Sequence, residues 1–157
     1  MGTLEEWLVK ELTRRHASIT TAESCTGGFI SGRIVNASGA SHVFNQSFVT
    51  YSNEAKKTLL GVKQETLDQV GAVSEETAYQ MAEGAAKAAN AGVALSVTGI
   101  AGPDGGTPEK PVGLVYIGCY CFGETVVEKH IFSGDRAQIR EAAVEKALTL
   151  AKKCLEA

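Results

Sequence analysis

The sequence lacks the features that mark membrane, nucleic-acid-binding and secreted proteins. No apolar run approaches the ~18 residues of a membrane-spanning helix, and lysine and arginine are scattered along a chain of formal net charge −3. No basic stripe therefore indicates a nucleic-acid partner. The N-terminal stretch MGTLEEWLVKELTRRH is acidic and amphipathic, unlike a signal or transit peptide. We expect a cytoplasmic protein with neither a membrane nor a nucleic acid as partner.

Cysteine and histidine are also scarce. There are four cysteines and three histidines, no C-x-x-C pair occurs, and His16, His42 and His130 lie far apart in the chain. The spacing of metal-binding motifs is therefore missing, and the sequence predicts no metal site. Reduced thiols are the ordinary state of cysteines in a cytosolic protein.

What is present is typical of one globular domain. The chain has 157 residues, of which 44% are hydrophobic and 21% charged, and no repeat, linker or low-complexity segment divides it. We expect a single α/β domain over residues 1–157, with three α/β/α layers around a mixed, mostly parallel sheet of about five strands. The expected helices are 4–16, 25–37, 52–61, 63–71, 75–90 and one from 135 onward, and the expected strands are 17–22, 42–51, 92–100, 114–123 and 125–132, the last two as a hairpin.

Residues 20–28, TTAESCTGG, place a serine and a cysteine where a strand meets a glycine-rich helix start. Backbone N–H groups at such a junction are unsatisfied and can hold an oxyanion, which is the setting of a nucleophilic serine. The residues alone equally allow Ser24 to be a helix cap, and they allow Cys25 to be the nucleophile. A buried structural thiol is the ordinary expectation for Cys25.

A nucleophilic serine needs a base, and no histidine stands at a diagnostic position. The S-x-x-K pattern fails because Gly27 occupies the place of the lysine. The second strand-to-helix junction, TYSNEAKK, offers Tyr51 with Lys56 or Lys57, and parallel neighbouring strands would bring it beside the first junction. A lysine acts as a base only where burial or nearby positive charge lowers its pKa.

Two further stretches carry groups that can bind anions. The stretch TGIAGPDGG contains four glycines whose backbone can approach a phosphate or a carboxylate: Gly99, Gly102, Gly105 and Gly106. It lacks the lysine of a P-loop and does not match G-x-G-x-x-G, so an ordinary tight connection explains it equally well. In FSGDRAQIR, Arg136 and Arg140 can each clamp a phosphate or lie in solvent.

Six stretches, in this order, are similar to the signature blocks of one family: TAESCTGG, FVTYSNEAK, GAVSEETA, VTGIAGPDGG, EKPVGLVYIG and FSGDR. The chain thus resembles the CinA C-terminal domain family, whose characterised activity is nicotinamide-nucleotide amidohydrolase, also called nicotinamide mononucleotide deamidase. The blocks cover most of the chain and each follows the family pattern. Longer CinA proteins carry an additional N-terminal domain, so we expect this chain to be the stand-alone amidase form.

The resemblance implies a fold similar to anticodon-binding-type domains and a Ser-Tyr-Lys arrangement. Carried onto this sequence, Ser24 is the nucleophile, and Tyr51 and Lys56 are its proton-transfer partners. The family pattern selects Lys56 over Lys57, and it leaves Cys25 as a packing residue.

On this basis we expect hydrolysis of a linear carboxamide, that of nicotinamide mononucleotide, to nicotinate mononucleotide and ammonia. Backbone N–H groups of Thr26, Gly27 and Gly28 are expected to hold the oxyanion. The four loop glycines named above, with Arg136 or Arg140, are expected to bind the phosphate.

No metal and no organic cofactor is required for this reaction. The partner is a small nucleotide, and a homodimer is consistent with a small metabolic enzyme. Two alternatives stand beside the deamidase: a non-catalytic nucleotide-binding or competence-related module, and a cysteine hydrolase that uses Cys25.

Overall fold

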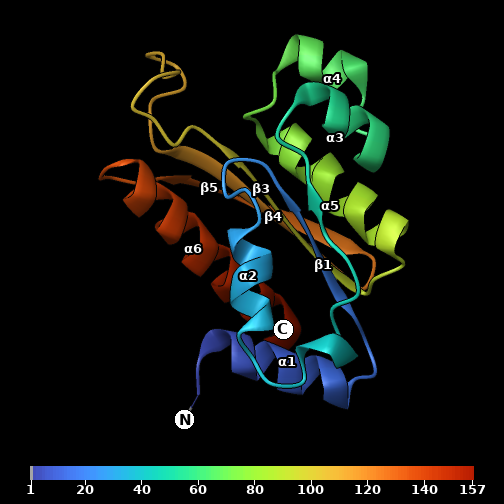
Figure 1. The fold of residues 1–157 in the computed structure, drawn as a ribbon. Helices are drawn as coiled ribbons and strands as arrows, with labels where there is room; N and C mark the ends of the chain where they lie inside the picture. The colour runs from blue at the N-terminus through green and yellow to red at the C-terminus, as the bar shows by residue number, and fades with distance from the viewer. Residues whose placement is uncertain (1) are drawn as a thin grey trace.

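A five-stranded sheet forms the middle layer of the fold (Figure 1). The structure is a computed structural model that describes residues 2–157. The strands are β1 (Ile19–Glu23), β2 (Phe48–Val49), β3 (Val93–Gly99), β4 (Leu114–Cys121) and β5 (Glu124–Ile131), in the order β2-β1-β3-β4-β5. β1 pairs in parallel with β2 and β3, whereas β4 pairs antiparallel with β3 and β5. Four of the five strands therefore run in one direction, and the predicted mixed, mostly parallel sheet is confirmed.

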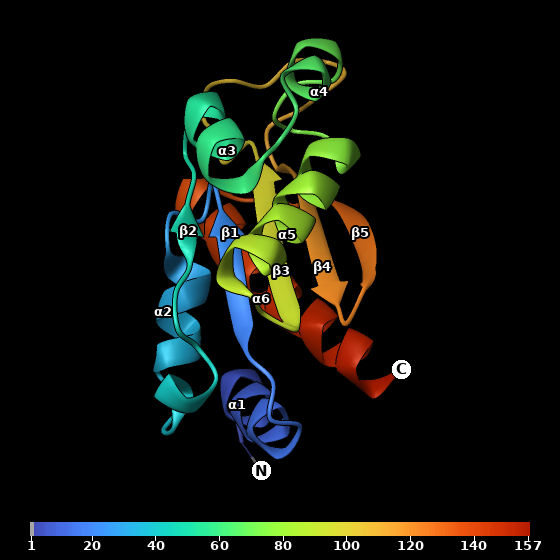
Figure 2. The ribbon, with the colours of Figure 1, turned by 90° about the vertical axis from the view of Figure 1, so that its right-hand side faces the viewer.

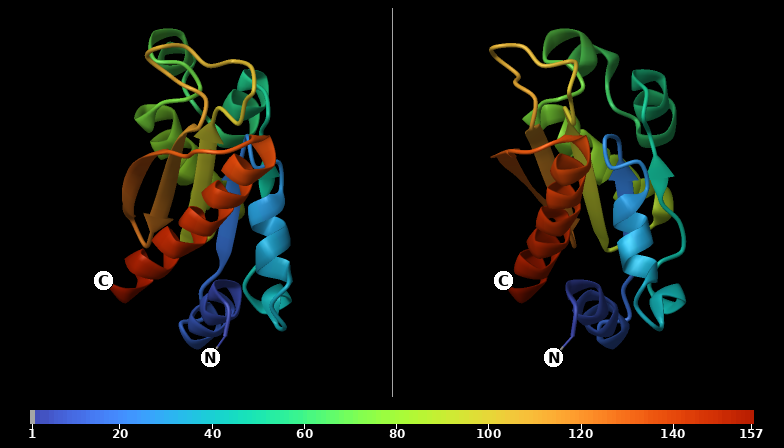
Figure 3. Two further views of the ribbon diagram at one scale, coloured as in Figure 1. Left: turned by 90° about the vertical axis from the view of Figure 1, so that its left-hand side faces the viewer. Right: turned by 60° about the vertical axis from the view of Figure 1, so that its left-hand side comes forward.

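Helices cover both faces of the sheet, which confirms the three predicted layers (Figure 2). One side carries α1 (Leu4–Arg14), α2 (Phe29–Val35) and α6 (Arg136–Glu156), and the other carries α3 (Asn53–Leu60), α4 (Gln64–Gln69) and α5 (Glu75–Ala89). α6 crosses the sheet diagonally beside α2 (Figure 3). On the opposite face α5 packs on β3 and β4, and α3 packs on α5.

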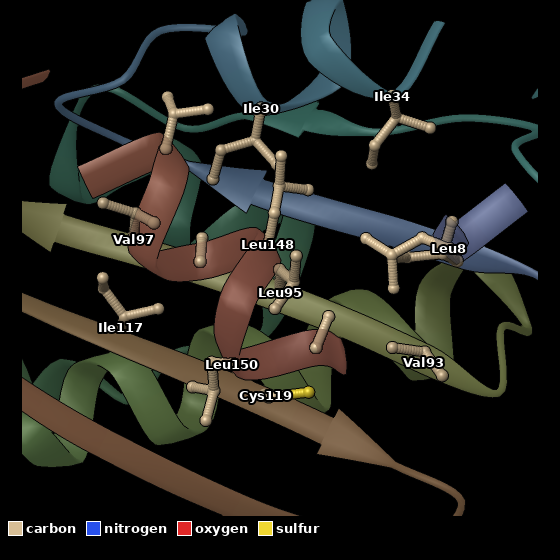
Figure 4. Close-up of a cluster of buried hydrophobic side chains, with 14 of the residues drawn as sticks. Leu8, Ile30, Ile34, Val93, Leu95, Val97, Ile117, Cys119, Leu148 and Leu150 are labelled. Atoms are coloured by element: carbon tan, nitrogen blue, oxygen red, sulfur yellow. The ribbon is translucent and has the colours of Figure 1, made fainter. Parts of the chain in front are cut away.

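The larger of two hydrophobic clusters lies between the sheet and α6 (Figure 4). Val93, Leu95 and Val97 of β3 point into it and pack with Leu148 of α6. The intervening Ala94 belongs to the second cluster, under α5. Because β3 is buried on both faces, its sequence is a continuous apolar run and not an alternating one.

Local signals in the sequence set most element ends correctly. Ser52, Ser74 and Asp135 are N-caps whose side chains accept the N–H of the residue three positions later, as expected at helix starts. The hairpin turns at Phe122 and Gly123, which have φ of 48° and 102°. Two successive positive φ angles are those of the two-residue turn that fits strand twist.

Two elements are shorter than the sequence predicts. The strand expected over 42–51 is reduced to Phe48–Val49, and a 3₁₀ helix, Ala40–His42, precedes it. This segment runs along β1 but meets it through isolated bonds, such as Ile19 N–H to the Val43 carbonyl at 2.8 Å. The helix expected over 25–37 begins only at Phe29.

The late start of α2 has a backbone cause. Gly27 and Gly28 have φ of 56° and 106°, which is the left-handed region that a helix cannot contain. These glycines form a turn between β1 and α2, and they are not inside the helix as predicted.

Three observations concern membrane and metal contacts. Within residues 2–157 no helix is both long enough and apolar enough to cross a bilayer. Over the same residues, no three His, Cys, Asp or Glu side chains are grouped as metal ligands. All four cysteines are free thiols.

Gly84 of α5 and Gly32 of α2 give a matched test of how closely α3 packs on α5. A Cβ on Gly84 would lie 1.8 Å from the Leu60 carbonyl oxygen, whereas a Cβ on Gly32 would meet nothing within 4 Å. We expect Gly84→Ala to lower the free energy of unfolding by at least ~2 kcal/mol, because backbone must shift. Gly32→Ala should raise it by about 0.5–1 kcal/mol. Urea denaturation measures both, and equal effects would contradict the close contact.

Candidate active site

The site lies at the edge of the sheet where the parallel strands end. Ser24 directly follows β1, and Lys56 lies in α3, which follows β2, so the two junctions share this edge. Figure 2 shows α3 beside the end of β1. A cavity of about 220 Å³ opens there. Its lining comes from Ser24, Cys25, Tyr51, Asn53, Lys56, Ala72, Val73, Thr98, Gly99, Ala101 and Arg136.

A larger groove of about 780 Å³ lies between α2 and α6. Its lining contains two carboxylates, Glu141 and Glu145, but no serine, cysteine, lysine or histidine, so it lacks the hydroxyl or thiol nucleophile that the sequence predicts. The smaller cavity is therefore the candidate site.

Ser24 and Lys56 are in direct contact. The Lys56 Nζ donates to Ser24 Oγ at 3.1 Å and to the Thr50 carbonyl at 2.9 Å. The Lys56 side chain comes from the buried face of α3 and is only 1% exposed, although it is among the longest in the chain. Lys57 is the next residue of the same helix and does not line the cavity. Of the two lysines left open by spacing, the structure places Lys56 beside the serine.

Burial lowers the pKa of Lys56 below its ordinary value, because the charged ammonium loses its hydration. No Asp or Glu within residues 2–157 forms an ion pair with Lys56, so nothing of that kind restores the pKa. The neutral amine, which is the form that accepts a proton, is thus available at lower pH than for a lysine in water.

The environment of Cys25 disfavours its reactive form, whereas that of Lys56 favours it. The Cys25 side chain is buried in the cluster between the sheet and α6, and burial raises the pKa of its thiol to about 11. A thiol attacks as the thiolate, so this environment disfavours Cys25 as a nucleophile. Its expected role as a packing residue agrees with its burial.

Tyr51 lies at the rim of the cavity and not between Ser24 and Lys56. It is 63% exposed, and its hydroxyl accepts a hydrogen bond from Arg136 Nη2 at 3.1 Å. Among residues 2–157 it makes no hydrogen bond with Ser24 or Lys56. Arg136 also donates to the Gly102 carbonyl at 2.7 Å, so it ties the rim to the loop after β3.

The turn after Ser24 differs from expectation in which N–H groups are free. The Gly27 N–H donates to the Ser24 carbonyl at 3.0 Å, and the Gly28 N–H donates to a Glu23 carboxylate oxygen at 3.1 Å. Both amides are used within the chain, because the turn and the start of α2 need them. The N–H groups of Cys25 and Thr26 donate to no other residue among residues 2–157, so of the three predicted donors only Thr26 stays free, and Cys25 joins it.

Arg140 supports this turn from the outside. Its Nε donates to the Cys25 carbonyl at 2.8 Å, its Nη2 donates to the Thr26 carbonyl at 3.2 Å, and its guanidinium lies 4.1 Å from the Phe29 ring centre. Because two of its N–H groups hold the backbone and its side chain lies outside the cavity lining, Arg140 is not placed to clamp a phosphate there.

The four loop glycines are divided by the structure. Gly99 lines the cavity, and a Cβ there would meet Val115 and the Leu114 carbonyl. Gly102, Gly105 and Gly106 lie in the loop between β3 and β4, which extends beyond the sheet (Figure 1), and they do not line the cavity. Gly102 and Gly106 pack closely against Val112, and Gly105 has the positive φ of a turn.

Sequence reasoning missed four contributors. Glu23 is fully buried behind the turn, and the only signal for it was its place inside the TAESCTGG block. Thr50 acts through its backbone carbonyl, which no side-chain pattern reveals. Thr98 and Asn53 line the cavity because the fold brings them there, and no motif in the sequence marked them as site residues.

Comparison with known proteins identifies the family of this chain. The CinA C-terminal domain matches residues 1–155. The chain belongs to this family. The resemblance inferred from the order of the motifs is thus confirmed.

The curated relatives of this CinA domain are longer proteins. The CinA-like protein of Kosmotoga olearia is 54% identical over 98% of this chain, and a putative competence-damage inducible protein of Clostridioides difficile is 52% identical over 92% of it. The chain spans only 37% and 35% of their lengths.

Solved structures of CinA proteins match almost end to end. The competence/damage inducible protein CihA of Agrobacterium tumefaciens has a TM-score of 0.94 at 42% identity, covering 96% of this chain and 93% of its own. A CinA superfamily protein of Escherichia coli has a TM-score of 0.92 at 34% identity, covering 96% of this chain and 87% of its own. The fold is therefore that of the CinA superfamily.

The lowered pKa of Lys56 makes a prediction about stability. An unfolded lysine titrates near ~10.4, so between the folded pKa and that value the unfolded chain binds more protons. Stability therefore rises with pH across this window, and below the folded pKa the destabilisation from burying the charge is constant. We expect Lys56→Met to abolish this rise.

The measurement is the free energy of unfolding by urea at several pH values from 7 to 10. Lys57→Met, one residue away on the same helix, is the control and should keep the pH dependence of the wild-type protein. A constant difference between wild-type protein and Lys56→Met over the whole range would contradict the lowered pKa.

Proposed function

We propose that this CinA domain is an amidohydrolase that converts nicotinamide mononucleotide to nicotinate mononucleotide and ammonia. The observation that carries the proposal is the 3.1 Å contact between Ser24 Oγ and the buried amine of Lys56. A serine next to a lysine of lowered pKa is a nucleophile with its base. The choice of a pyridine nucleotide amide rests on the resemblance to the family's characterised activity.

Acylation begins with the neutral form of Lys56. Its amine keeps a hydrogen bond to the Thr50 carbonyl and accepts the hydroxyl proton of Ser24 through its lone pair. Ser24 Oγ then bonds to the carboxamide carbon. The resulting oxyanion is held by the free N–H groups of Cys25 and Thr26.

The intermediate collapses when Lys56 returns its proton to the leaving nitrogen, and ammonia departs. Water then attacks the acyl-enzyme with Lys56 as base, and the carboxylate product and free Ser24 are formed. Nucleophile, base and oxyanion donors are all groups of this chain, so the proposed steps use no metal and no organic cofactor.

The size of the cavity limits which part of the substrate enters it. Its volume of about 220 Å³ is below the ~300–1,000 Å³ of sites that enclose a whole drug-sized ligand. A pyridine carboxamide is therefore the part we place inside, and the ribose phosphate would cross the rim. Arg136 and Tyr51 stand at that rim, so Arg136 is the arginine we propose for the phosphate.

Ammonia release from nicotinamide mononucleotide tests the function directly. We expect turnover by the wild-type protein, a loss of at least ~10³-fold in Ser24→Ala because the nucleophile is gone, and substantial activity in Cys25→Ala. Coupled detection of ammonia, with nicotinate mononucleotide identified by mass spectrometry, measures all three.

Each alternative has its own result in this assay. Binding of the nucleotide with no ammonia from the wild-type protein would favour a non-catalytic nucleotide-binding module. Loss of activity in Cys25→Ala with retention in Ser24→Ala would transfer the nucleophile to the thiol.

The pH dependence of turnover tests the base. Activity should rise with pH through the lowered pKa of Lys56 and reach its plateau at a lower pH than a free lysine of pKa ~10.4 would give, because the neutral amine is the active form. Lys57→Met should keep this profile, and Lys56→Met should lose both the rise and the activity. Initial rates from pH 6 to 10 provide the comparison, and an unchanged profile in Lys56→Met would exclude Lys56 as the base.

A further inference from the structure

The carboxylate of Glu23 is buried directly behind the nucleophile, although the proposed mechanism gives it no step. Glu23 is the last residue of β1 and is fully buried. Its backbone is fixed on both sides, since its carbonyl accepts the Thr50 N–H at 2.8 Å and the Ser24 N–H donates to the Val97 carbonyl at 3.0 Å. The side chain faces α2 and does not line the cavity.

Six groups that can donate hydrogen bonds surround this carboxylate. One oxygen accepts the Thr26 hydroxyl at 2.7 Å, the Ile30 N–H at 2.9 Å and the Gly28 N–H at 3.1 Å. The other accepts the Ser31 hydroxyl at 2.7 Å, the Ser31 N–H at 2.9 Å and the Thr21 hydroxyl at 3.1 Å. This set suits a group that only accepts, and an amide in its place would turn its NH₂ toward donors.

Three of the six donors are the first free N–H groups of α2. The N-cap residue, Gly28, has no side chain to satisfy them, and no other side-chain cap is present. Glu23 takes this role from five residues earlier in the chain, with a negative charge at the positive end of the helix. The turn of residues 24–28 is therefore closed on its inner side by one carboxylate.

The same turn carries the free N–H groups of Cys25 and Thr26. Arg140 holds the carbonyl of the peptide that joins these two residues, and in a trans peptide the N–H points the opposite way. Glu23 holds Thr26 and Gly28 on the inner side, while Arg140 holds the outer side. The direction of the Thr26 N–H is thus set by these two side chains together.

We propose that Glu23 is a positioning residue that keeps the turn of residues 24–28 in the shape that binds the oxyanion on Ser24. The inference rests on Ser24 being the nucleophile, as in the proposed function, but it does not depend on which amide is the substrate. Without the carboxylate, the amides of Gly28, Ile30 and Ser31 compete for other acceptors, and the turn loses its fixed shape.

The test uses a readout that is independent of deamidation. A fluorophosphonate forms a bond from Ser24 Oγ to phosphorus, the phosphorus–fluorine bond breaks, fluoride leaves, and the hydroxyl proton passes to Lys56. The phosphoryl oxygen occupies the oxyanion position. Intact-protein mass spectrometry gives the second-order rate of labelling, with Ser24→Ala as the blank.

Two isosteric variants separate positioning from stability. Thr26→Val and Thr21→Val each remove one hydroxyl that donates to Glu23, and both threonines are fully buried. Only Thr26 belongs to the turn. We expect labelling to slow ~10-fold or more in Thr26→Val and ~10²-fold in Glu23→Gln, the range seen when an oxyanion donor is lost. Thr21→Val should stay within about twofold of the wild-type rate, although its melting temperature falls comparably to that of Thr26→Val.

The outcomes are distinct. Equal slowing in Thr21→Val and Thr26→Val, in proportion to their loss of melting temperature, would reduce Glu23 to a structural role and overturn the proposal. Absence of Ser24 labelling in the wild-type protein would overturn it as well. The wild-type protein could instead be labelled rapidly, with the expected ranking of variants, yet release no ammonia from nicotinamide mononucleotide. That result would support the role of Glu23 and exclude the proposed substrate.

Discussion

The contact of a buried lysine amine with a serine hydroxyl is the constraint on which the rest of the site depends. Taking an ammonium out of water is costly, and among the residues that the structure describes the Lys56 amine has two hydrogen-bond partners, Ser24 Oγ and the Thr50 carbonyl. Thr50 also donates its N–H to the Glu23 carbonyl, so one peptide segment links the base to the strand that carries the nucleophile. Parallel pairing of β1 with β2 is what brings these groups to one edge of the sheet.

The fold keeps the two buried charged side chains next to Ser24 apart. Glu23 faces α2 and is satisfied by six donors, whereas Lys56 enters from α3 on the other side of Ser24. A carboxylate paired with Lys56 would raise the pKa of the amine and remove its value as a base. Satisfying the carboxylate with N–H and hydroxyl groups instead lets both charges lie next to the same serine without cancelling each other's chemistry.

Residues that sequence reasoning assigned to the substrate are used here to build the backbone. Arg140 donates to two carbonyls of the turn, and Gly28 starts α2 in a left-handed conformation. Arginine and glycine serve equally well for binding anions and for shaping loops, because both uses exploit the same donors and the same freedom of the backbone. Only the groups that each residue contacts in the folded protein distinguish the two uses.

The sequence by itself determined the layered α/β fold, the helix starts near residues 52, 75 and 135, the hairpin at Phe122 and Gly123, and membership of the CinA family, because each depends on local chemistry or on motif order. It could not give the length of β2, which depends on pairing with β1. Residue spacing left Lys56 and Lys57 open, the family resemblance favoured Lys56, and the tertiary structure showed its contact with the serine. Only the tertiary structure decided which amides of the turn stay free, and that a glutamate closes the turn from behind. Those facts follow from distances between segments remote in the chain, and from backbone groups that every residue carries and no motif records.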